Sequence, residues 1–510
     1  MILPLPDRTA LASDDDFDRR RDAHVRPESW QNPVPRERYN LVVIGGGPAG
    51  LITSIAAAGL GARVALVERD RLGGDCLNVG CVPSKSLLRA AKAAAAIRSA
   101  SRFGVAADAE PRVDFDAVMR QVRQSRATLS RHDAAARYRD SGVDVFFGEG
   151  AFQDPNSFEV AGQRLRFTRA VLCTGARARI PSIPGLADAR FLTNESVFSL
   201  RELPRRLTVL GGGPIGCELA QAFARLGSQV TLFDTGSRLL PRDDEAAVRL
   251  VQAQLEADGV RIHCESQVTQ IVPCGAVQLV HFDHRGAGGS LETDAILVAT
   301  GRVPNTEGLG LERAGVRANS QTGVEVDDFL RTSSRHIFAA GDVCSAWRFT
   351  HAADAMARIV VRNALFPGKT RVSRLLIPWC TYTDPELAQV GLTELEAQRQ
   401  NIPLSTFEVN LAELDRGVVD GVPFGLVRVH VAPNKDRILG ATVVGPHAGD
   451  LISQVSLAMT NGLGLAAFAQ TIVPYPSLAE AFKRAADARN RTRLTPWVRS
   501  LLQRWFAWTR

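Results

Sequence analysis

Short apolar runs, glycine turns and helices follow one another early in the chain. Residues Leu41–Ile44 form an apolar run of the kind expected of a buried parallel strand. The run leads into the turn Gly45–Gly50, an alanine-rich helix through Ala58, and a second strand over Val64–Val67 that ends at Glu68. This order of strand, glycine turn, helix and strand predicts a dinucleotide-binding unit.

The same pattern recurs in the middle of the chain. A strand is expected over Leu207–Leu210, followed by the turn Gly211–Gly216, a helix over Leu219–Leu226 and a strand over Gln229–Phe233 that ends at Asp234. The acid falls at the same offset from the first glycine in both copies. Each copy therefore has the context that a GxGxxG turn requires, and one dinucleotide-binding architecture occurs twice.

The repetition extends to two Thr-Gly pairs. Thr174-Gly175 follows a strand over Ala170–Cys173, and Thr300-Gly301 follows a strand over Ala295–Ala299. Thr174 and Gly175 in the first copy, and Gly301 in the second, are therefore candidate cofactor contacts.

The chain changes character from about Arg371. Short strands are expected over Gly425–Val431 and Ile438–Val444, and helices over Gly449–Asn461 and Leu478–Arg489. This mixture predicts a separate α+β domain.

The three glycines of each turn have different physical tasks. The first permits the tight bend, the second lets the backbone approach a pyrophosphate, and the third allows close packing of helix on strand. In chain order they are Gly45, Gly47 and Gly50, and Gly211, Gly213 and Gly216. The pyrophosphate would lie at a helix N-terminus, where unpaired N–H groups and the helix dipole favour anions.

An acid ends the second strand of each copy. Glu68 and Asp234 are the expected acceptors for a ribose 2′-hydroxyl. A carboxylate at Asp234 repels a 2′-phosphate and so favours NADH over NADPH, although the neighbouring Arg238 could offset it.

Composition limits the class of protein. The 510 residues are 45% hydrophobic and 23% charged, which is ordinary for a soluble chain with several cores. Eight cysteines with one closely spaced pair do not make a secreted disulfide framework. Met1–Asp7 lacks the pattern of a secretory signal, and no apolar run is long enough to cross a bilayer. We therefore expect a cytoplasmic protein.

The net charge of +7 is concentrated near the two ends. The positive residues gather at Arg19–Arg21 and between Arg484 and Arg510. Residues before about Asn40 are polar and interrupted by prolines, so we expect partial order there and a solvated N-terminal cluster. No nucleic-acid partner is expected.

The segment Gly73–Lys85 carries the candidate chemistry. Cys76 and Cys81 cannot pair inside one regular helix, because five residues rise about 7.5 Å and a disulfide needs Cα atoms about 4.4–6.8 Å apart. We therefore expect Cys76 in an irregular loop and Cys81 in the first turn of the following helix. There the helix N-terminus and Lys85 would lower the thiol pKa. The pair is predicted to be a redox-active disulfide, and half of a metal site or two buried thiols are the alternatives. No metal site is expected.

This segment resembles the active-site signature of the class I pyridine nucleotide–disulfide oxidoreductases, which include glutathione reductase, dihydrolipoamide dehydrogenase and mercuric reductase. The resemblance extends from about Tyr39 to Arg489. It implies FAD on the first Rossmann-like unit, NAD(P)H on the second, and a homodimer. The fold class is α/β, with two Rossmann-like dinucleotide-binding domains and a C-terminal α+β dimerisation domain.

The resemblance also implies roles for individual residues. Cys81 would be the flavin-proximal thiolate that forms a charge-transfer complex, and Cys76 would be the thiol that attacks the acceptor. Lys85 would lie near the flavin, paired with Glu218.

Two later segments are similar to family motifs. Ala340–Asp342 is similar to the second FAD motif, with Gly341 in the turn and Asp342 on the ribityl chain. Gly301–Asn305 is similar to the segment that links the nicotinamide domain back to the FAD domain. The expected domains are an N-terminal extension (1–38), an FAD domain in two parts (39–190 and 311–370), an NAD(P) domain (191–310), a dimerisation domain (371–490) and an amphipathic tail (491–510).

One departure from the family pattern concerns the acid/base group. Glutathione reductase and dihydrolipoamide dehydrogenase have a His-Pro…Glu motif near the C-terminus, whereas Tyr475-Pro476 and Glu480 stand here. Tyrosine titrates near pH 10 and is a poor base for a dithiol. Mercuric reductases also have tyrosine, so the chain is most similar to mercuric-reductase-like proteins. Packing of Tyr475 at an interface is the alternative.

A second departure concerns the metal-delivery cysteines. Mercuric reductases end in a vicinal cysteine pair, but no cysteine follows Cys380 here. The acceptor is therefore left as a disulfide or a soft metal ion. An NADH:quinone or oxidase reaction, and a redox-sensing or metal-sequestering flavoprotein with little turnover, stay as alternatives.

The C-terminal tail has helical periodicity. Trp497, Leu501 and Trp505 fall on one face, with Arg499 and Arg504 between them. Packing on the chain's own dimer is the more ordinary interpretation, and contact with an anionic membrane surface is the alternative.

Overall fold

The computed structural model describes residues 16–106, 111–367 and 369–510. The expectation about a secretory signal at Met1–Asp7 lies outside them. The chain forms two compact units, one of residues up to 237 with 259–375, and one of residues 238–258 with 376–510. Within the described part of the chain, no helix is long and apolar enough to span a bilayer.

A parallel sheet holds the first glycine turn. Within a seven-stranded sheet, β1 lies between β2 and β6 in the order β3-β2-β1-β6, and β6 also pairs with β19 (Ile337–Ala339). These strands are β1 (Tyr39–Ile44), β2 (Val64–Glu68), β3 (Val143–Phe147) and β6 (Gln163–Leu172). Their pairings are all parallel. Helices pack on one face, and residues of strands and loops, such as Phe152, Phe158 and Leu311, cover the other, so the strands are buried on both faces.

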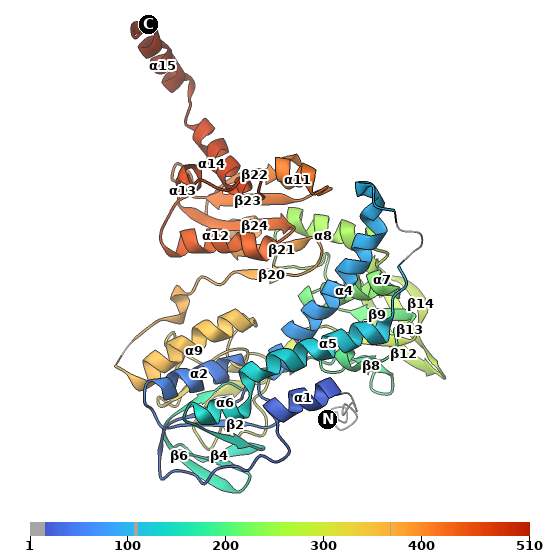
Figure 1. The fold of residues 1–510 in the computed structure, drawn as a ribbon, viewed down its shortest axis with the longest axis vertical. Helices are drawn as coiled ribbons and strands as arrows, with labels where there is room; N and C mark the ends of the chain where they lie inside the picture. The colour runs from blue at the N-terminus through green and yellow to red at the C-terminus, as the bar shows by residue number, and fades with distance from the viewer. Residues whose placement is uncertain (1–15, 107–110, 368) are drawn as a thin grey trace. The chain divides into compact units, whose positions relative to one another are not determined.

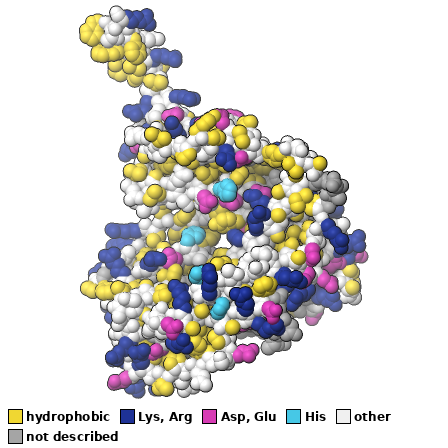
Figure 2. Space-filling view, in the orientation of Figure 1, with side chains coloured by type: hydrophobic (Ala, Val, Ile, Leu, Met, Phe, Trp, Pro, Cys, Tyr) yellow, Lys and Arg dark blue, Asp and Glu magenta, His cyan; other side chains and the backbone are white. Residues whose placement is uncertain are grey.

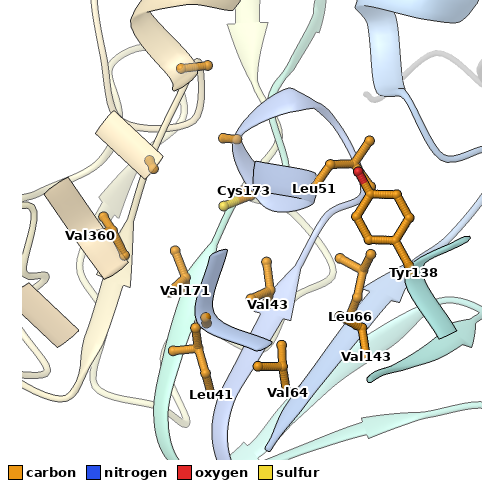
Figure 3. Close-up of a cluster of buried hydrophobic side chains, with 14 of the residues drawn as sticks. Leu41, Val43, Leu51, Val64, Leu66, Tyr138, Val143, Val171, Cys173 and Val360 are labelled. Carbon is orange, nitrogen blue, oxygen red and sulfur yellow. The ribbon is translucent and has the colours of Figure 1, made fainter. Parts of the chain in front are cut away.

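The core of this sheet extends onto two helices. The helix α2 (Pro48–Gly59) follows the glycine turn and lies beside α9 (Thr350–Leu365) (Figure 1). Leu41, Val43, Leu66 and Val171 converge beneath them (Figure 3). This packing fixes the carboxyl ends of β1 and β6, where the glycine turn and Thr174 stand.

A second parallel sheet in the same unit holds the second glycine turn. Its order is β11-β10-β9-β15-β8. The strands are β8 (Phe191–Leu192), β9 (Arg206–Leu210), β10 (Gln229–Phe233), β11 (Arg261–His263) and β15 (Ala295–Val298), and α7 (Pro214–Leu226) follows the turn. The duplicated architecture expected from the sequence is therefore confirmed.

The other elements of this unit include further strands and the helices around the cysteines. They are α3 (Gly74–Asn78), α4 (Cys81–Ser99), α5 (Phe115–Leu129), α6 (Ala135–Asp140), β4 (Gly150–Asp154), β5 (Ser157–Val160), β7 (Ala176–Ala178), the antiparallel set β12 (Ser266–Cys274), β13 (Val277–His284) and β14 (Ala287–Thr293), β16 (Arg302–Pro304), β17 (Ala318–Asn319), β18 (Gly323–Val324) and β19 (Ile337–Ala339).

The second unit is an antiparallel sheet covered by helices, as the α+β expectation requires. The sheet order is β20-β21-β24-β23-β22. The strands are β20 (Trp379–Thr381), β21 (Glu386–Gly391), β22 (Ser405–Asn410), β23 (Leu426–Val431) and β24 (Ile438–Gly445), and the helices are α10 (Glu394–Arg399), α11 (Asp415–Val419), α12 (Ala448–Thr460), α13 (Ala466–Gln470), α14 (Glu480–Thr492) and α15 (Pro496–Trp508).

One segment from the middle of the chain joins this second unit. It carries α8 (Glu245–Ala257). The Trp379 indole donates to Asp243 at 2.7 Å, and Arg428 donates to Asp244 at 2.6 Å. The sequence did not indicate this excursion, because the partners are far apart along the chain.

The described part of the N-terminal extension begins at residue 16 with a helix that was not expected from the sequence. Residues Asp16–Val25 form a helix, α1, in which Asp18, Arg21 and Val25 are buried. Arg21 pairs with Asp18 at 2.9 Å and with Asp22 at 2.8 Å. The expectation of a solvated cluster at Arg19–Arg21 was therefore wrong for Arg21, because acids on the same helix neutralise it.

Candidate active site

The two cysteines lie at a junction between two helices. Cys76 is in the one-turn helix α3, which begins after Gly73, and Cys81 is the first residue of α4. The expectation for Cys81 is confirmed. The expectation of an irregular loop at Cys76 was wrong. Gly73, at φ +90°, allows a short helix to start at Gly74, and this helix ends before Gly80, the N-cap of α4.

Gly80 allows the two cysteine segments to approach each other. A Cβ at this position would lie 2.8 Å from the Asp75 carbonyl oxygen and 3.5 Å from the Cys76 Cα. A side chain here would therefore push the α3 backbone away from the start of α4. Both cysteines are free thiols, with a hydrogen bond from Cys76 to Cys81.

The two thiols differ strongly in acidity. The hydrogen bond from Cys76, the Thr350 hydroxyl and the charge of Lys85 lower the pKa of Cys81 to about 6, although burial opposes them. The hydrogen bond to Cys81 and burial raise the pKa of Cys76, and the Asp133 carboxylate adds to this shift. Cys81 is thus the thiolate of the pair near neutral pH.

Thr350 and Asp133 were missed in the sequence. Thr350 opens α9, and its Oγ1 lies 3.4 Å from the Cys81 Sγ. Asp133 lies against Gly73, where a Cβ would be 2.8 Å from its Oδ2. Neither residue stands in a local motif, and only the fold brings them to the cysteines.

An ion pair joins the cysteine helix to the second glycine turn. Lys85 Nζ, one turn after Cys81, lies 2.8 Å from Glu218 Oε2 on α7. The Glu218 side chain is 6% exposed. The structure thus brings together the two residues that the family resemblance pairs.

A second charged contact involves Asp75, the residue before Cys76. Arg302, from Gly301–Asn305, pairs with this carboxylate. Its Nε is 3.7 Å from Asp342 Oδ2. Burial raises the pKa of Asp342, although Arg302 opposes this. The two segments that resemble family motifs therefore meet beside residues 73–81, the cysteine loop that holds α3 and the start of α4.

The first glycine turn has the form needed for a dinucleotide. Glu68 accepts backbone hydrogen bonds from Gly46 at 2.6 Å and from Asp70 at 2.7 Å, which fix its carboxylate beside the turn. Burial raises the pKa of Glu68, although these two bonds oppose it. Gly47 is the N-cap of α2, so its backbone lies where a pyrophosphate meets a helix N-terminus. These residues fit the FAD expected there.

The second glycine turn repeats this geometry. Asp234 accepts backbone hydrogen bonds from Gly212 and Gly236, both at 2.6 Å. A Cβ on Gly213 would have no atom within 4 Å, so the face of the turn is open. The residues fit a nicotinamide dinucleotide.

Arg238 and Thr174 both form hydrogen bonds with backbone groups. The Arg238 guanidinium donates to the carbonyl oxygens of Leu240, Pro241 and Asp243. Thr174 Oγ1 donates to the Asn305 carbonyl oxygen at 2.7 Å, and the Asn305 amide donates back to Thr174 at 2.9 Å. The hydrogen bonds to the three carbonyl oxygens occupy the Arg238 guanidinium. The two hydrogen bonds between Thr174 and Asn305 connect the end of β6 to the segment Gly301–Asn305.

Tyr475 and Glu480 lie in the second unit. The Tyr475 side chain is 74% exposed, and its hydroxyl donates to Asp415 at 2.5 Å. That hydrogen bond raises the pKa of Tyr475. Glu480 opens α14 and pairs with Arg484 at 2.9 Å. Among the described residues, no group of three or more His, Cys, Asp or Glu side chains is arranged to hold a metal ion.

Comparison with known proteins agrees with this geometry. Residues 39–357 match the model of the pyridine nucleotide-disulphide oxidoreductases, and residues 377–486 match the dimerisation domain of the same family. The chain belongs to this family. It therefore uses FAD and NAD(P)H, with a redox-active disulfide, and its dimerisation domain supports a homodimer.

Several relatives cover most of the chain. A mercuric reductase of Streptomyces lividans is 35% identical over 88% of this chain and 96% of its own length, and one of Bacillus cereus is 33% identical over 88% and 71%. A dihydrolipoyl dehydrogenase of Chlamydia trachomatis is 32% identical over 88% and 96%.

A solved oxidoreductase of this family has the same fold. The HOCl-induced flavoprotein disulfide reductase RclA from Escherichia coli is 29% identical, with a TM-score of 0.79, over 88% of this chain and 99% of that one. A Cu(II) complex of the same reductase is also 29% identical, with a TM-score of 0.79, over 87% and 98%. The family is thus shared with proteins that are named for different acceptors.

Proposed function

We propose that this oxidoreductase passes two electrons from NAD(P)H, through FAD and the Cys76/Cys81 pair, to a thiophilic metal ion such as Hg(II) or Cu(II). The observation that carries the proposal is the thiol pair. Cys81 begins a helix beside Thr350 and Lys85, where its thiolate form is favoured, and thiolates are the ligands that soft metal ions prefer. Mercuric reductases and a Cu(II) complex among the relatives support this class of acceptor.

Tyr475 supports a metal ion over a dithiol or disulfide. Release of a thiol from a substrate disulfide is helped by an acid that titrates near neutral pH. The pKa of Tyr475 is raised by its hydrogen bond to Asp415, so this side chain does not exchange a proton at neutral pH. Reduction of a metal ion held by two thiolates needs no such acid.

The electrons and protons of the proposed cycle balance. When bound, FAD accepts a hydride from NAD(P)H and delivers two electrons to the Cys76–Cys81 disulfide. The hydride carries one proton with its two electrons, so the disulfide becomes the Cys76 thiol and the Cys81 thiolate. The Cys76 proton leaves when the two sulfurs bind the metal ion. The disulfide then re-forms as two electrons pass to one Hg(II), giving Hg(0), or to two Cu(II), giving two Cu(I). Each cycle consumes one NAD(P)H and releases one proton.

NADH is the proposed donor. Two backbone hydrogen bonds hold the Asp234 carboxylate beside the second turn, where it can accept a ribose 2′-hydroxyl and repel a 2′-phosphate. Carbonyl oxygens occupy the Arg238 guanidinium, which removes the main reason to expect NADPH.

The proposal is tested by acceptor-dependent NADH oxidation. We would compare Hg(II), Cu(II), oxidised glutathione, lipoamide and a benzoquinone, using the wild type, Cys76→Ser, Cys81→Ser and the matched control Cys274→Ser, which removes an exposed thiol. Turnover with a metal ion that needs Cys76 and Cys81, but not Cys274, would support the proposal.

The other outcomes identify the alternatives. Faster, cysteine-dependent turnover with lipoamide or oxidised glutathione would indicate a disulfide reductase. Full quinone turnover by Cys76→Ser would indicate a quinone or oxidase reaction. Reduction of the cysteines without turnover on any acceptor would indicate a redox sensor.

We also propose that the tail places the enzyme at the anionic, cytoplasm-facing surface of a membrane. The expected amphipathic helix is present as α15, which is capped by Thr495, begins at Pro496 and has no buried residue. Hydrophobic side chains cover much of it, with arginines around them (Figure 2). The exposed apolar side chains are Trp497, Leu501, Leu502, Trp505, Phe506 and Trp508.

Charge selects lipid over a second protein surface as the partner. At 100° per residue, Arg499 and Arg504 fall on opposite borders of the apolar face, as in helices that lie in a membrane interface. No acidic residue follows Asp487, whereas six arginines do, at 489, 491, 493, 499, 504 and 510. Each cation near an anionic leaflet contributes about 1 kcal/mol.

Vesicle co-sedimentation tests this contact. The enzyme should bind phosphatidylglycerol–phosphatidylcholine vesicles and not pure phosphatidylcholine, with a blue shift of tryptophan emission. Arg499→Glu/Arg504→Glu should abolish binding, while the control Arg164→Glu/Arg313→Glu, at two exposed arginines elsewhere, should keep it. No binding by the wild type, together with a change of oligomeric state on removal of 495–510, would mean that the tail packs on the dimer instead.

A further inference from the structure

The helix α1 precedes the residues that match the family model, which begin at Tyr39, yet it contacts the approach to the cysteine loop. The Val25 carbonyl oxygen accepts a hydrogen bond from Leu72 N at 3.1 Å. Just after the helix, Arg26 Nη1 donates to the carbonyl oxygens of Arg69 at 2.8 Å and Asp70 at 2.9 Å. Hydrogen bonds from the N-terminal extension thus fix the backbone between β2 and Gly73.

Two carboxylates of α1 reach further toward the cysteines. The Asp22 carboxylate accepts hydrogen bonds from Arg71 Nε at 2.8 Å and from Arg71 Nη2 at 3.1 Å. Asp18 pairs with Arg126 of α5 at 3.1 Å, and Arg126 Nη1 donates to the Asn78 carbonyl oxygen at 3.0 Å. Asn78 ends α3, two residues after Cys76, so a chain of charged contacts links the N-terminal helix to the cysteine loop.

The link is buried. The side chains of Asp18 and Arg126 are 8% and 5% exposed. Removing one partner of a buried pair leaves an uncompensated charge, whereas the intact pair fixes geometry. Asn78 in turn fixes the start of α3, because its amide donates to the carbonyl oxygens of Leu72 at 3.1 Å and Gly74 at 2.9 Å. α1 also packs along α5 (Figure 1).

We propose that α1 is a positioning element for the redox pair: through Asp18, Arg126 and Asn78 it holds α3 against Gly80, so that Cys76 stays beside Cys81. Each thiol has a high effective concentration for the other, because the reduced pair loses little conformational freedom when the disulfide forms. A looser α3 would lower that effective concentration and make the disulfide easier to reduce. Asp18 and Arg126 are positioning residues that touch neither cofactor nor acceptor.

The test measures the reduction potential of the pair in the full-length, FAD-loaded enzyme. Wild type, Asp18→Asn and the control Asp16→Asn, whose carboxylate lies exposed on the same helix, would be equilibrated in reduced and oxidised dithiothreitol. The Cys76–Cys81 disulfide would be quantified by alkylation and mass spectrometry. We expect the equilibrium constant for disulfide formation to fall about tenfold in Asp18→Asn and to stay unchanged in Asp16→Asn. kcat should fall while KM for NADH stays the same.

A second variant keeps the proposal testable if Asp18→Asn does not fold. Arg26→Ala removes two hydrogen bonds to residues 69 and 70 from a half-buried side chain and leaves no buried charge. It should shift the same equilibrium about threefold with FAD retained. Wild-type potentials in every folded, FAD-loaded variant would overturn the proposal. This result would not depend on which acceptor the enzyme reduces.

Discussion

The two glycine turns have the same backbone conformation and differ in the atoms that lie against their second glycine. Gly45 and Gly211 both have φ of +109°. In each copy a Cβ on the third glycine would lie within 2 Å of the first glycine's carbonyl oxygen, at 1.8 and 1.9 Å. At the second glycine the copies diverge, because a Cβ on Gly47 would lie 3.8 Å from Gly74 Cα, whereas one on Gly213 would meet no atom within 4 Å.

The difference follows from where the cysteine loop is inserted. Gly73 N donates to the Gly46 carbonyl oxygen at 2.8 Å, so the start of the cysteine loop is hydrogen-bonded to the backbone of the first turn. The second turn carries no such loop, and its open face suits a nucleotide that enters and leaves. One strand–turn–helix unit can therefore hold either a resident cofactor or an exchanging one.

The comparison is tested most severely at the third glycines. In Gly50→Ala the new methyl group would overlap the Gly45 carbonyl oxygen, and in Gly216→Ala it would overlap that of Gly211. We expect each variant to lose at least about 3 kcal/mol of local stability. Gly50→Ala should lose FAD, whereas Gly216→Ala should keep FAD and lose reduction by NADH. Flavin absorbance per protein and the rate of flavin reduction measure these effects, and equal loss of FAD in both would break the comparison.

The acid of the second turn gives the next largest effect. Asp234→Ala removes the carboxylate that Gly212 and Gly236 hold in place. The KM for NADH should rise about tenfold, the equivalent of one hydrogen bond to a ribose hydroxyl. The KM for NADPH should fall, because the repulsion of a 2′-phosphate is gone. Steady-state kinetics with both nucleotides decide this, and an unchanged ratio of the two KM values would contradict the assignment of the second turn.

The Lys85–Glu218 pair joins the two copies and should have a similar or smaller effect. Glu218→Gln leaves Lys85 without its 2.8 Å carboxylate partner. Flavin reduction by NADH should slow about five- to tenfold, and the double variant with Lys85→Met should be little slower than Lys85→Met alone, as expected for residues that act together. Stopped-flow reduction measures this, and additive effects would argue against coupling.

At pH 8, the smallest effect is expected at Thr350. The hydrogen bond from Cys76, followed by that of Thr350, lowers the pKa of Cys81 to about 6, so the thiolate is present above this pH and is lost as the pH falls through it. In Thr350→Val the pKa of Cys81 should rise by about one unit, which is about tenfold less thiolate on the acid side and little change at pH 8. The pH profile of iodoacetamide alkylation of the reduced enzyme reports this, and an unshifted profile would remove Thr350 from the site.

Local patterns predicted the duplicated turns, the start of α4 at Cys81 and the amphipathic tail, because each depends on residues within one turn or strand. They could not reveal Thr350, which lies far from Cys81 in the sequence and reaches it only because α9 packs beside α2. The order in α1 was missed for the same reason. Its polar residues resemble a solvated segment until Arg71 and Arg126 are brought opposite Asp22 and Asp18.

Electrons should pass through Cys76 and Cys81, and an anaerobic titration with NADH can follow them. After two electrons, we expect a long-wavelength absorbance band from the Cys81 thiolate beside oxidised flavin, which is lost in Cys81→Ala and unchanged in Cys274→Ser. Bleaching of the flavin by the first two electrons, with no such band in the wild type, would place the cysteines outside the pathway and contradict the account.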